Sequence, residues 1–427
     1  MRAEPSSLQA LIDDALAATP PGRAVWVALS GGLDSSLLLT LAVAASRRHQ
    51  RPLRALHIHH GLQAAADDFE RHCRELCERL GVSLRVERVD VDVSSGEGLE
   101  GAARHARYAA FQRCLEAGDT LWLAQHRDDQ AETFLLAALR GAGPRGLAAM
   151  PGERGQAGVR LARPWLGVSR AALEAEAARR GLAWVEDPSN AETVQNRNFL
   201  RHRIMPALQE RWSGAGTALA RSAELAGEAD GLLDEFAAED LERLGGDPGR
   251  LVVDSLMVLS AARRRLLIRH CLSRLGLSSP PARRLDSLLD QLEARHDAEV
   301  RIVWKGGEVR VWRKALYLME TPVPLPPAWR TEWDGRSPLV TPLGEFRMDL
   351  VREDGSSASL TLAPRLGGER LRLPGRGRRD LKRLLQELDV PPWQRDRSWV
   401  AWHGESVVAL GGPEGWLALA EGWRAPS

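Results

Sequence analysis

The stretch AVWVALSGGLDS, residues 24–35, decides the fold of the amino-terminal half of this chain. Ala24–Leu29 is a short apolar run, which is typical of a buried strand. Ser30–Ser35 is a glycine-rich turn, and the apolar pattern after it predicts a helix over about residues 34–47. A strand that passes through glycines directly into a helix is the first half of a β-α-β unit.

Similar units follow along the chain. Strands are predicted at Leu53–His59, Leu84–Val89 and Thr120–Ala124, with helices at 66–80, 98–116 and 128–139; a helix at 169–180 and a strand at Trp184–Val185 close the unit. Strict alternation of strand and helix predicts an α/β fold, a doubly wound parallel sheet with helices on both faces. The loops after the strands then share one edge, where such sheets bind ligands.

The rest of the chain has a different pattern. A catalytic α/β domain is predicted over residues 1–215, a mainly helical domain over 216–325 and a small α+β domain over 328–427. Within the helical domain, Lys305-Gly306-Gly307 predicts a hairpin between strands at Glu299–Trp304 and Glu308–Trp312. The proline-rich stretch 322–327 is interpreted as a linker, and one helix is expected at about 378–389.

Composition excludes several classes of protein. With 44% hydrophobic and 27% charged residues the chain is typical of a soluble protein, and no apolar run is long enough for a membrane helix. The first residues lack the pattern of a secretory signal, and four cysteines are too few for a disulfide framework, so a cytoplasmic protein is predicted. Only three of the 58 basic residues are lysines. A G+C-rich genome accounts for most of this bias, although arginine also suits phosphate binding.

The turn at 30–35 has the properties of a phosphate-binding loop. Gly31 and Gly32 let backbone N–H groups approach an anion, the helix N-terminus adds positive charge, and Ser30 and Ser35 add hydroxyl donors. Asp34 would repel phosphate unless a cation lay between them, so it implies Mg²⁺. The motif is neither a Walker A loop nor the dinucleotide fingerprint GxGxxG. The alternative is a capped strand-to-helix turn without a ligand.

Pairs of charged residues at helical spacing suggest further sites. Asp129 and Glu132 lie three residues apart and share one helix face at the ligand-binding edge, where two carboxylates could hold a cationic amine. The alternative is an acidic helix N-terminus that suits the helix dipole. Arg104 and Arg107, with Tyr108 beside them, have the same spacing and could hold phosphate; a solvated arginine stripe is the alternative.

Three other groups carry weaker signals. Arg197 and Arg201 share a helix face and are interpreted as contacts for phosphate or RNA. Histidines 57, 59, 60, 105 and 126 invite a metal hypothesis, but no acidic or cysteine ligand lies at a matching spacing, so a role in framing a nucleotide is preferred. Basic residues are dense over 365–383, near Trp393 and Trp399, which favours contact with nucleic acid over a merely solvated surface.

The loop resembles the SGGxDS pyrophosphate loop of the PP-loop ATPases, and further segments resemble one subfamily, the tRNA(Ile)-lysidine synthetases. The matching segments are HIHHGL (57–62) with Ala66-Asp67, EGAARHARY (100–108), AQHRDDQAET (124–133) with Arg140-Gly141 and Gly146-Leu147, EDPSN (186–190), RNFLR (197–201) and LKRLLQELDVPPWQRDR (381–397). The resemblance is close over about 1–215, looser over the helical middle, and returns from Pro374.

The resemblance implies an enzyme that uses ATP and Mg²⁺ to join free L-lysine to C2 of the wobble cytidine of tRNA(Ile) with anticodon CAU. It implies ATP binding by Ser30, Gly31, Gly32, Leu33, Asp34 and Ser35, with Asp34 as the Mg²⁺ ligand. It implies catalytic roles for Asp34, Asp129, Glu132 and Arg197, with the lysine held by Asp129 and Glu132. The residues expected to bind tRNA are Arg104, Arg107, Arg201, Arg376, Arg378, Arg379, Lys382 and Arg383.

Three alternatives stay open at this point. A tRNA 2-thiolase would normally use cysteines, often as CxxC, and none is present in that spacing. A small-molecule amidotransferase or synthetase, such as NAD or GMP synthetase, leaves the arginine-rich carboxyl-terminal segment unexplained. A tRNA-binding protein with an inactive ATPase core conflicts with an intact loop at 30–35. The sequence leaves open the oligomeric state, a homodimer included, the order of substrate binding and the general base.

Overall fold

The computed structural model describes residues 7–61, 66–92, 98–156, 158–186, 195–294 and 300–426. The chain folds into two compact units, Met1–Leu233 and Asp234–Ser427. Helix α10 (Ala215–Arg243) begins where the helical domain was expected and continues past the division between the units. In the part of the chain that the structure describes, no helix is both long and apolar enough to cross a bilayer.

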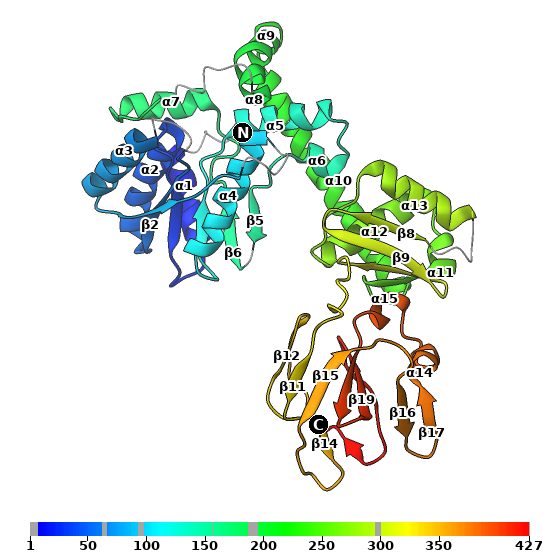
Figure 1. The fold of residues 1–427 in the computed structure, drawn as a ribbon. Helices are drawn as coiled ribbons and strands as arrows, with labels where there is room; N and C mark the ends of the chain where they lie inside the picture. The colour runs from blue at the N-terminus through cyan, green and yellow to red at the C-terminus, as the bar shows by residue number, and fades with distance from the viewer. Residues whose placement is uncertain are drawn as a thin grey trace. The chain divides into compact units, whose positions relative to one another are not determined.

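The first unit is built on a six-stranded sheet in the order β3-β2-β1-β4-β6-β5. Strands β2, β5 and β6 of this sheet are labelled in Figure 1. The strands are β1 (Val25–Ala28), β2 (Leu53–His59), β3 (Ser83–Arg88), β4 (Thr120–Trp122), β5 (Glu153–Gln156) and β6 (Val159–Ala162). All neighbouring pairs are parallel except β5 with β6. The predicted α/β class with a parallel sheet is confirmed.

Helices cover both faces of this sheet. One face packs against α1 (Leu8–Ala17), α2 (Leu33–His49), α3 (Ala66–Leu80) and α7 (Arg170–Arg179), and the other packs against α4 (Gly98–Cys114). Strand β1 shows the alternation, because Val25 and Val27 join the first core and Trp26 joins the second. Burial on both faces explains why residues 24–29 form an uninterrupted apolar run.

Two details of the sheet differ from the sequence analysis. The hairpin of β5 and β6 was not predicted, and β6 is the parallel neighbour of β4. The predicted strand at Trp184–Val185 is wrong. This segment lies beyond the end of β1 rather than along it, and the Val185 N–H donates to the Gly31 carbonyl at 3.1 Å. It therefore closes over the glycine-rich turn instead of extending the sheet.

Short helices complete the first unit around the end of β4. They are α5 (Arg127–Leu139), α6 (Pro144–Leu147), α8 (Asn196–Phe199), the π-helical turn η3 (Leu200–Ile204) and α9 (Met205–Arg211). The π-helical turn joins α8 to α9 without a break in the backbone. Residues 196–211 thus form one helical segment with a local change of pitch.

The second unit begins with helices packed on a small antiparallel sheet. The helices are α11 (Val253–Met257), α12 (Ala261–Arg274) and α13 (Ala282–Ala294), and the strands are β7 (Arg250–Val252), β8 (Arg301–Trp304), β9 (Gly307–Trp312) and β10 (Ala315–Met319). The predicted hairpin is confirmed as β8 paired with β9. Strands β7 and β10, which extend it to the order β7-β10-β9-β8, were not predicted.

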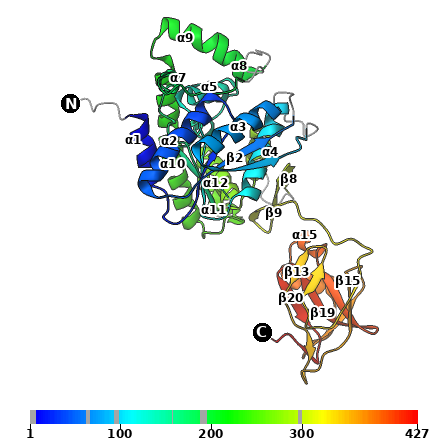
Figure 2. The ribbon, with the colours of Figure 1, turned by 90° about the vertical axis from the view of Figure 1, so that its left-hand side faces the viewer.

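The carboxyl-terminal part of the second unit is a separate α+β core (Figure 2). Its main sheet has the order β11-β15-β18-β19-β20, with β11 (Thr331–Trp333), β15 (Leu360–Pro364), β18 (Trp399–His403), β19 (Ser406–Gly412) and β20 (Gly415–Leu419). Three two-stranded ribbons flank it: β12 (Leu339–Thr341) with β13 (Gly344–Phe346), β14 (Val351–Arg352) with β21 (Trp423–Arg424), and β16 (Arg370–Leu373) with β17 (Gly377–Asp380). The helices are α14 (Leu381–Glu387) and α15 (Pro392–Arg395).

Candidate active site

The glycine-rich turn joins β1 to α2 in the geometry of an anion-binding loop. Gly31 has a φ of +92°, and a Cβ at this position would lie 3.1 Å from Phe69 Cδ1 and 3.3 Å from Cys73 Sγ. Only glycine fits both the backbone and the space. The hydroxyl oxygens of Ser30 and Ser35 lie 2.9 Å apart beside the first turn of α2. The first N–H groups of a helix have no partner within the helix, so the N-terminus of α2 and the two hydroxyls together give this turn several donors for an anion.

A cavity of about 930 Å³ opens above this loop. Its volume lies within the range of ligand pockets in enzymes. The loop forms one wall, and the other walls come from β2, α4, α5, α7 and the segment that contains η3. From the predicted site residues, the cavity wall includes Ser30, Gly32, Leu33, Asp34, Ser35, Arg107, Asp129 and Arg201. Arg170 and Trp184 also line it, and sequence reasoning missed both.

Asp34 lies in the first turn of α2 and faces this cavity. Burial raises the pKa of its carboxyl group, although electrostatic attraction to His126 and Arg170 acts in the opposite direction. Its Oδ1 atom is buried and has no hydrogen-bond partner among the described residues. Arg170 Nη1 lies 3.8 Å from the other oxygen. An acceptor atom in this state is suited to a cation that arrives with the ligand.

His126 lies at the centre of three carboxylates. Its side chain is 1% exposed, and its ring nitrogens lie 3.5 Å from Asp129, 3.7 Å from Asp128 and 3.8 Å from Asp34. These distances exceed hydrogen-bond range, and neither ring nitrogen has a hydrogen-bond partner in the described parts of the chain. The ring therefore lies between the phosphate loop and the start of α5, close to a carboxylate of each.

Asp129 and Glu132 share one face of α5, and both bind the same two arginines. Arg197 Nε donates to Glu132 at 2.9 Å, and its Nη2 donates to Asp129 at 3.1 Å. Arg201 Nε donates to Glu132 at 2.7 Å, and its Nη2 donates to Asp129 at 3.0 Å. Burial would raise the pKa of Asp129, but electrostatic attraction to His126, Arg197 and Arg201 outweighs it and lowers that pKa. The sequence analysis assigned these four residues to different ligands, whereas the structure joins them in one ion-pair cluster.

Arginines also surround Tyr108 at the side of the cavity. The guanidinium carbons of Arg104, Arg107 and Arg154 lie 5.4, 5.9 and 5.7 Å from the centre of its ring. These are cation–π distances, so Arg104 and Arg107 are held on an aromatic ring rather than forming a fully solvated stripe. Arg154 lies on β5, and sequence reasoning missed it because that hairpin was not recognised.

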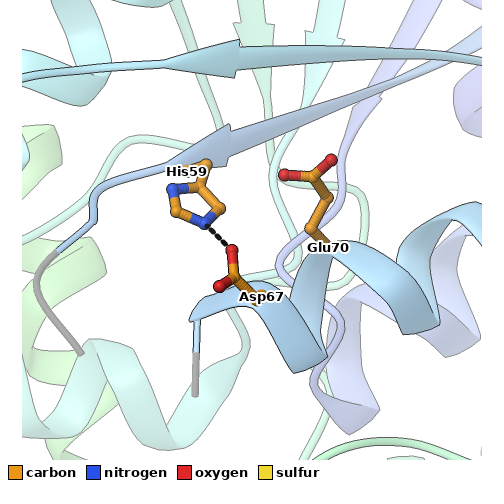
Figure 3. A group of neighbouring side chains, drawn as sticks. All are labelled: His59, Asp67 and Glu70. Carbon is orange, nitrogen blue, oxygen red and sulfur yellow. Dashed lines mark hydrogen bonds and ion pairs between the residues drawn. The ribbon is translucent and has the colours of Figure 1, made fainter. Parts of the chain in front are cut away.

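His59, Asp67 and Glu70 form the one group that could hold a metal ion among the described residues (Figure 3). The sequence analysis found no acidic or cysteine ligand at a spacing that matches the histidines, whereas the fold brings Asp67 Oδ1 to 3.1 Å from His59 Nε2. Glu70, however, accepts hydrogen bonds from Arg74 and Arg88, each at 2.7 Å. Its charge is already balanced, so this group holds the His59 ring at the cavity wall and is poorly suited to a metal ion.

Comparison with known proteins supports the same interpretation of the chain. The PP-loop domain family matches residues 5–208, the TilS substrate binding domain family matches 251–317, and the TilS substrate C-terminal domain family matches 360–415. The tRNA(Ile)-lysidine synthase of Xanthomonas axonopodis pv. citri is 45% identical, covering 93% of this chain and 90% of its own length. Those of Alkalilimnicola ehrlichii and Pseudomonas putida are 45% and 46% identical, covering 92% and 90% of this chain and 91% of their own lengths.

This chain belongs to the tRNA(Ile)-lysidine synthase family. Its carboxyl-terminal basic residues lie on the β16–β17 hairpin and at the start of α14. All five that were expected to bind tRNA are exposed: Arg376, Arg378, Arg379, Lys382 and Arg383. Arg376 pairs with Glu387 at 2.8 Å, and Asp380 caps α14 by accepting from the Lys382 and Arg383 N–H groups. The hairpin and the helix thus present their basic side chains to solvent.

Part of the resemblance to the lysidine synthase family lies outside the described residues. The structure does not describe residue 62 of the segment HIHHGL or residues 187–190 of the segment EDPSN. It also does not describe the side chain of Glu100. The cavity itself is lined by described residues between positions 28 and 202, all of which belong to the first unit.

Proposed function

We propose that this protein joins L-lysine to C2 of the wobble cytidine of tRNA(Ile) with anticodon CAU, giving lysidine and releasing AMP and pyrophosphate. The observation that supports the proposal is the cavity, whose lining includes the phosphate-loop residues Ser30, Asp34 and Ser35 and also Asp129 of α5. The family of the chain supplies the choice of tRNA and of lysine.

The first step activates the base. The C2 oxygen of cytidine attacks the α-phosphorus of ATP, the bond to the β-phosphate breaks, and pyrophosphate leaves. The loop at 30–35 would bind the departing phosphates through helix N–H groups and the Ser30 and Ser35 hydroxyls. The base must leave its stack to reach the cavity, as in other enzymes that modify a single nucleotide.

The second step replaces oxygen by nitrogen. The ε-amine of lysine attacks C2, the bond from C2 to the adenylated oxygen breaks, AMP leaves with that oxygen, and a proton is released. Asp129 and Glu132 would hold the incoming amine, because two carboxylates on one helix turn suit a cationic ligand. Arg197, bound to both, would position them.

Mg²⁺ fits the site, and Asp34 would hold it. The fit rests on the buried Oδ1 atom of Asp34, which lacks a hydrogen-bond partner among the described residues. The ion would neutralise charge on the triphosphate as pyrophosphate departs.

RNA contacts are proposed at two basic surfaces. Arg104 and Arg107 beside Tyr108 would hold RNA at the cavity, where an aromatic ring and guanidinium groups suit an unstacked nucleotide. The exposed residues Arg376, Arg378, Arg379, Lys382 and Arg383 would bind backbone phosphate. Arg201 was also expected to bind tRNA, but its guanidinium contacts Asp129 and Glu132 and would have to leave them first.

The cysteines argue against the thiolase alternative. All four, Cys73, Cys77, Cys114 and Cys271, are buried and free of disulfides. Burial raises the pKa of the Cys77 thiol to about 11 and that of Cys271 to about 12. A sulfur carrier needs an accessible thiolate, and these thiols are neither accessible nor ionised at neutral pH.

The test is to incubate the protein with ATP, Mg²⁺, labelled L-lysine and an unmodified tRNA(Ile) transcript, and to measure label in the RNA. We expect incorporation that disappears when the wobble cytidine is changed. Asp34→Asn should lower it at least about 100-fold, because charge stabilisation is lost. The exposed Asp14→Asn on α1 is the matched control. AMP formation without incorporation would leave the ATP chemistry standing and overturn the substrate.

A further inference from the structure

The carboxylates proposed to hold lysine already have a full complement of positive charge. Glu132 is 2% exposed and Asp129 is 9% exposed, and together they accept from both Arg197 and Arg201 at 2.7 to 3.1 Å. Two negative charges therefore face two positive charges. A third cation at this place would be buried without a counter-charge, which is strongly unfavourable.

The two arginines are not equivalent. Arg201 lines the cavity together with Asp129, whereas Arg197 and Glu132 lie outside the cavity wall. Burial would lower the pKa of the Arg201 guanidinium, but the hydrogen bond to Glu132 and the negative charges of Glu132, Asp129 and Asp34 outweigh it and raise that pKa. Arg201 therefore binds the two carboxylates and also lines the same cavity as the phosphate loop.

The backbone at Arg201 is also unusual. It lies in the π-helical turn Leu200–Ile204, between the short helices α8 and α9. Turns of this kind are rare and are concentrated at functional sites. A guanidinium binds phosphate as readily as carboxylate, through the same planar fork of donors. A triphosphate in the cavity would therefore compete with Asp129 and Glu132 for Arg201.

We propose that Arg201 is an internal counter-ion that occupies the place of the substrate's ammonium group, and that ATP draws it toward the phosphates so that lysine can bind. The inference rests on the proposed function, since it takes Asp129 and Glu132 as the lysine site. It makes lysine binding conditional on bound nucleotide. It also excludes free lysine and other primary amines from the carboxylates of the empty enzyme.

Thermodynamic linkage makes the proposal measurable in two directions. If nucleotide raises the affinity for lysine by some factor, lysine must raise the affinity for nucleotide by the same factor. We expect a factor of at least about 10, within the usual range for coupled sites. The effect of lysine on the affinity for nucleotide can be measured on the wild-type protein, so it does not depend on the folding of any variant.

The experiment is calorimetric titration of L-lysine into the full chain with Mg²⁺, with and without α,β-methylene ATP. The wild-type protein should bind lysine at least about tenfold more tightly with the analogue. Arg201→Gln should bind lysine without the analogue and show almost no coupling. Arg203→Gln is the matched control, because Arg203 is an exposed arginine in the same π-helical turn and should keep the coupling.

Equal lysine affinity with and without the analogue in the wild-type protein would overturn the inference, as would coupling that persists in folded Arg201→Gln. The labelling assay separates this failure from failure of the proposed function. Lysine incorporated into RNA without coupling would refute only the role of Arg201. No incorporation and no lysine binding in any nucleotide state would refute both.

Discussion

At the scale of single residues, the two adjacent glycines of the phosphate loop differ in whether a side chain could replace their hydrogen. Gly31→Ala forces a side chain into a left-handed conformation against Phe69 and Cys73, so we expect a loss of about 1–3 kcal/mol in unfolding free energy. The affinity for an ATP analogue should fall with it. Gly32→Ala is the control, since its φ is −77° and the nearest atom to a new Cβ, Ser30 Oγ, is 3.7 Å away. Urea unfolding and nucleotide titration measure both variants, and equal losses would show that the conformation of Gly31 is unimportant.

Some contacts of the candidate site could be predicted from the sequence, and others could not. The loop at 30–35 was predictable because its function depends on neighbours in the chain, and the structure places it as expected between β1 and α2. The bonds from Arg197 and Arg201 to Asp129 and Glu132 were not, because they join side chains 65 to 72 positions apart. Spacing shows that two residues share a helix face but does not show which distant helix they meet.

At the scale of elements, strong apolar periodicity was reliable and short polar strands were not. Strand β1 was found because both of its faces are buried, which gives a continuous apolar run. Strand β5 has the sequence ERGQ, which carries no strand signal, and its pairing with β6 supplies the stability that propensity does not. The change of pitch at η3 likewise depends on tertiary contacts, and no pattern in the sequence predicts it.

The β16–β17 hairpin is the element on which the RNA-binding proposal can be tested. Replacing Arg378 and Arg379 by glutamine should weaken binding of tRNA and reduce the slope of log affinity against log salt concentration by about 1 for each phosphate that is no longer bound. Arg330 and Arg347 are exposed arginines of the same domain, and replacing this pair in the same way is the matched control. Filter binding at several salt concentrations measures both. Equal slopes for the two double variants would remove the hairpin from the RNA interface.

At the scale of the whole molecule, each of the two units has cores of its own, and the cavity belongs entirely to the first. Calorimetry should therefore show more than one unfolding transition, and an ATP analogue with Mg²⁺ should shift only one of them. At a hundred times its dissociation constant the analogue adds about 2.7 kcal/mol. For a unit of this size that raises the transition temperature by roughly 5–10 °C.

The transitions can be assigned with one core substitution. Leu385 is fully buried in the carboxyl-terminal core, so Leu385→Ala should cost about 2–5 kcal/mol there. It should lower a transition that the nucleotide leaves in place, while the nucleotide-dependent transition keeps its temperature. If calorimetry shows a single transition whose temperature is shifted both by Leu385→Ala and by the nucleotide, the two units unfold together. In that case nucleotide bound near Asp34 in the first unit would also stabilise the second unit, which contains the β16–β17 hairpin. Nucleotide binding and the folding of the second unit would then be coupled.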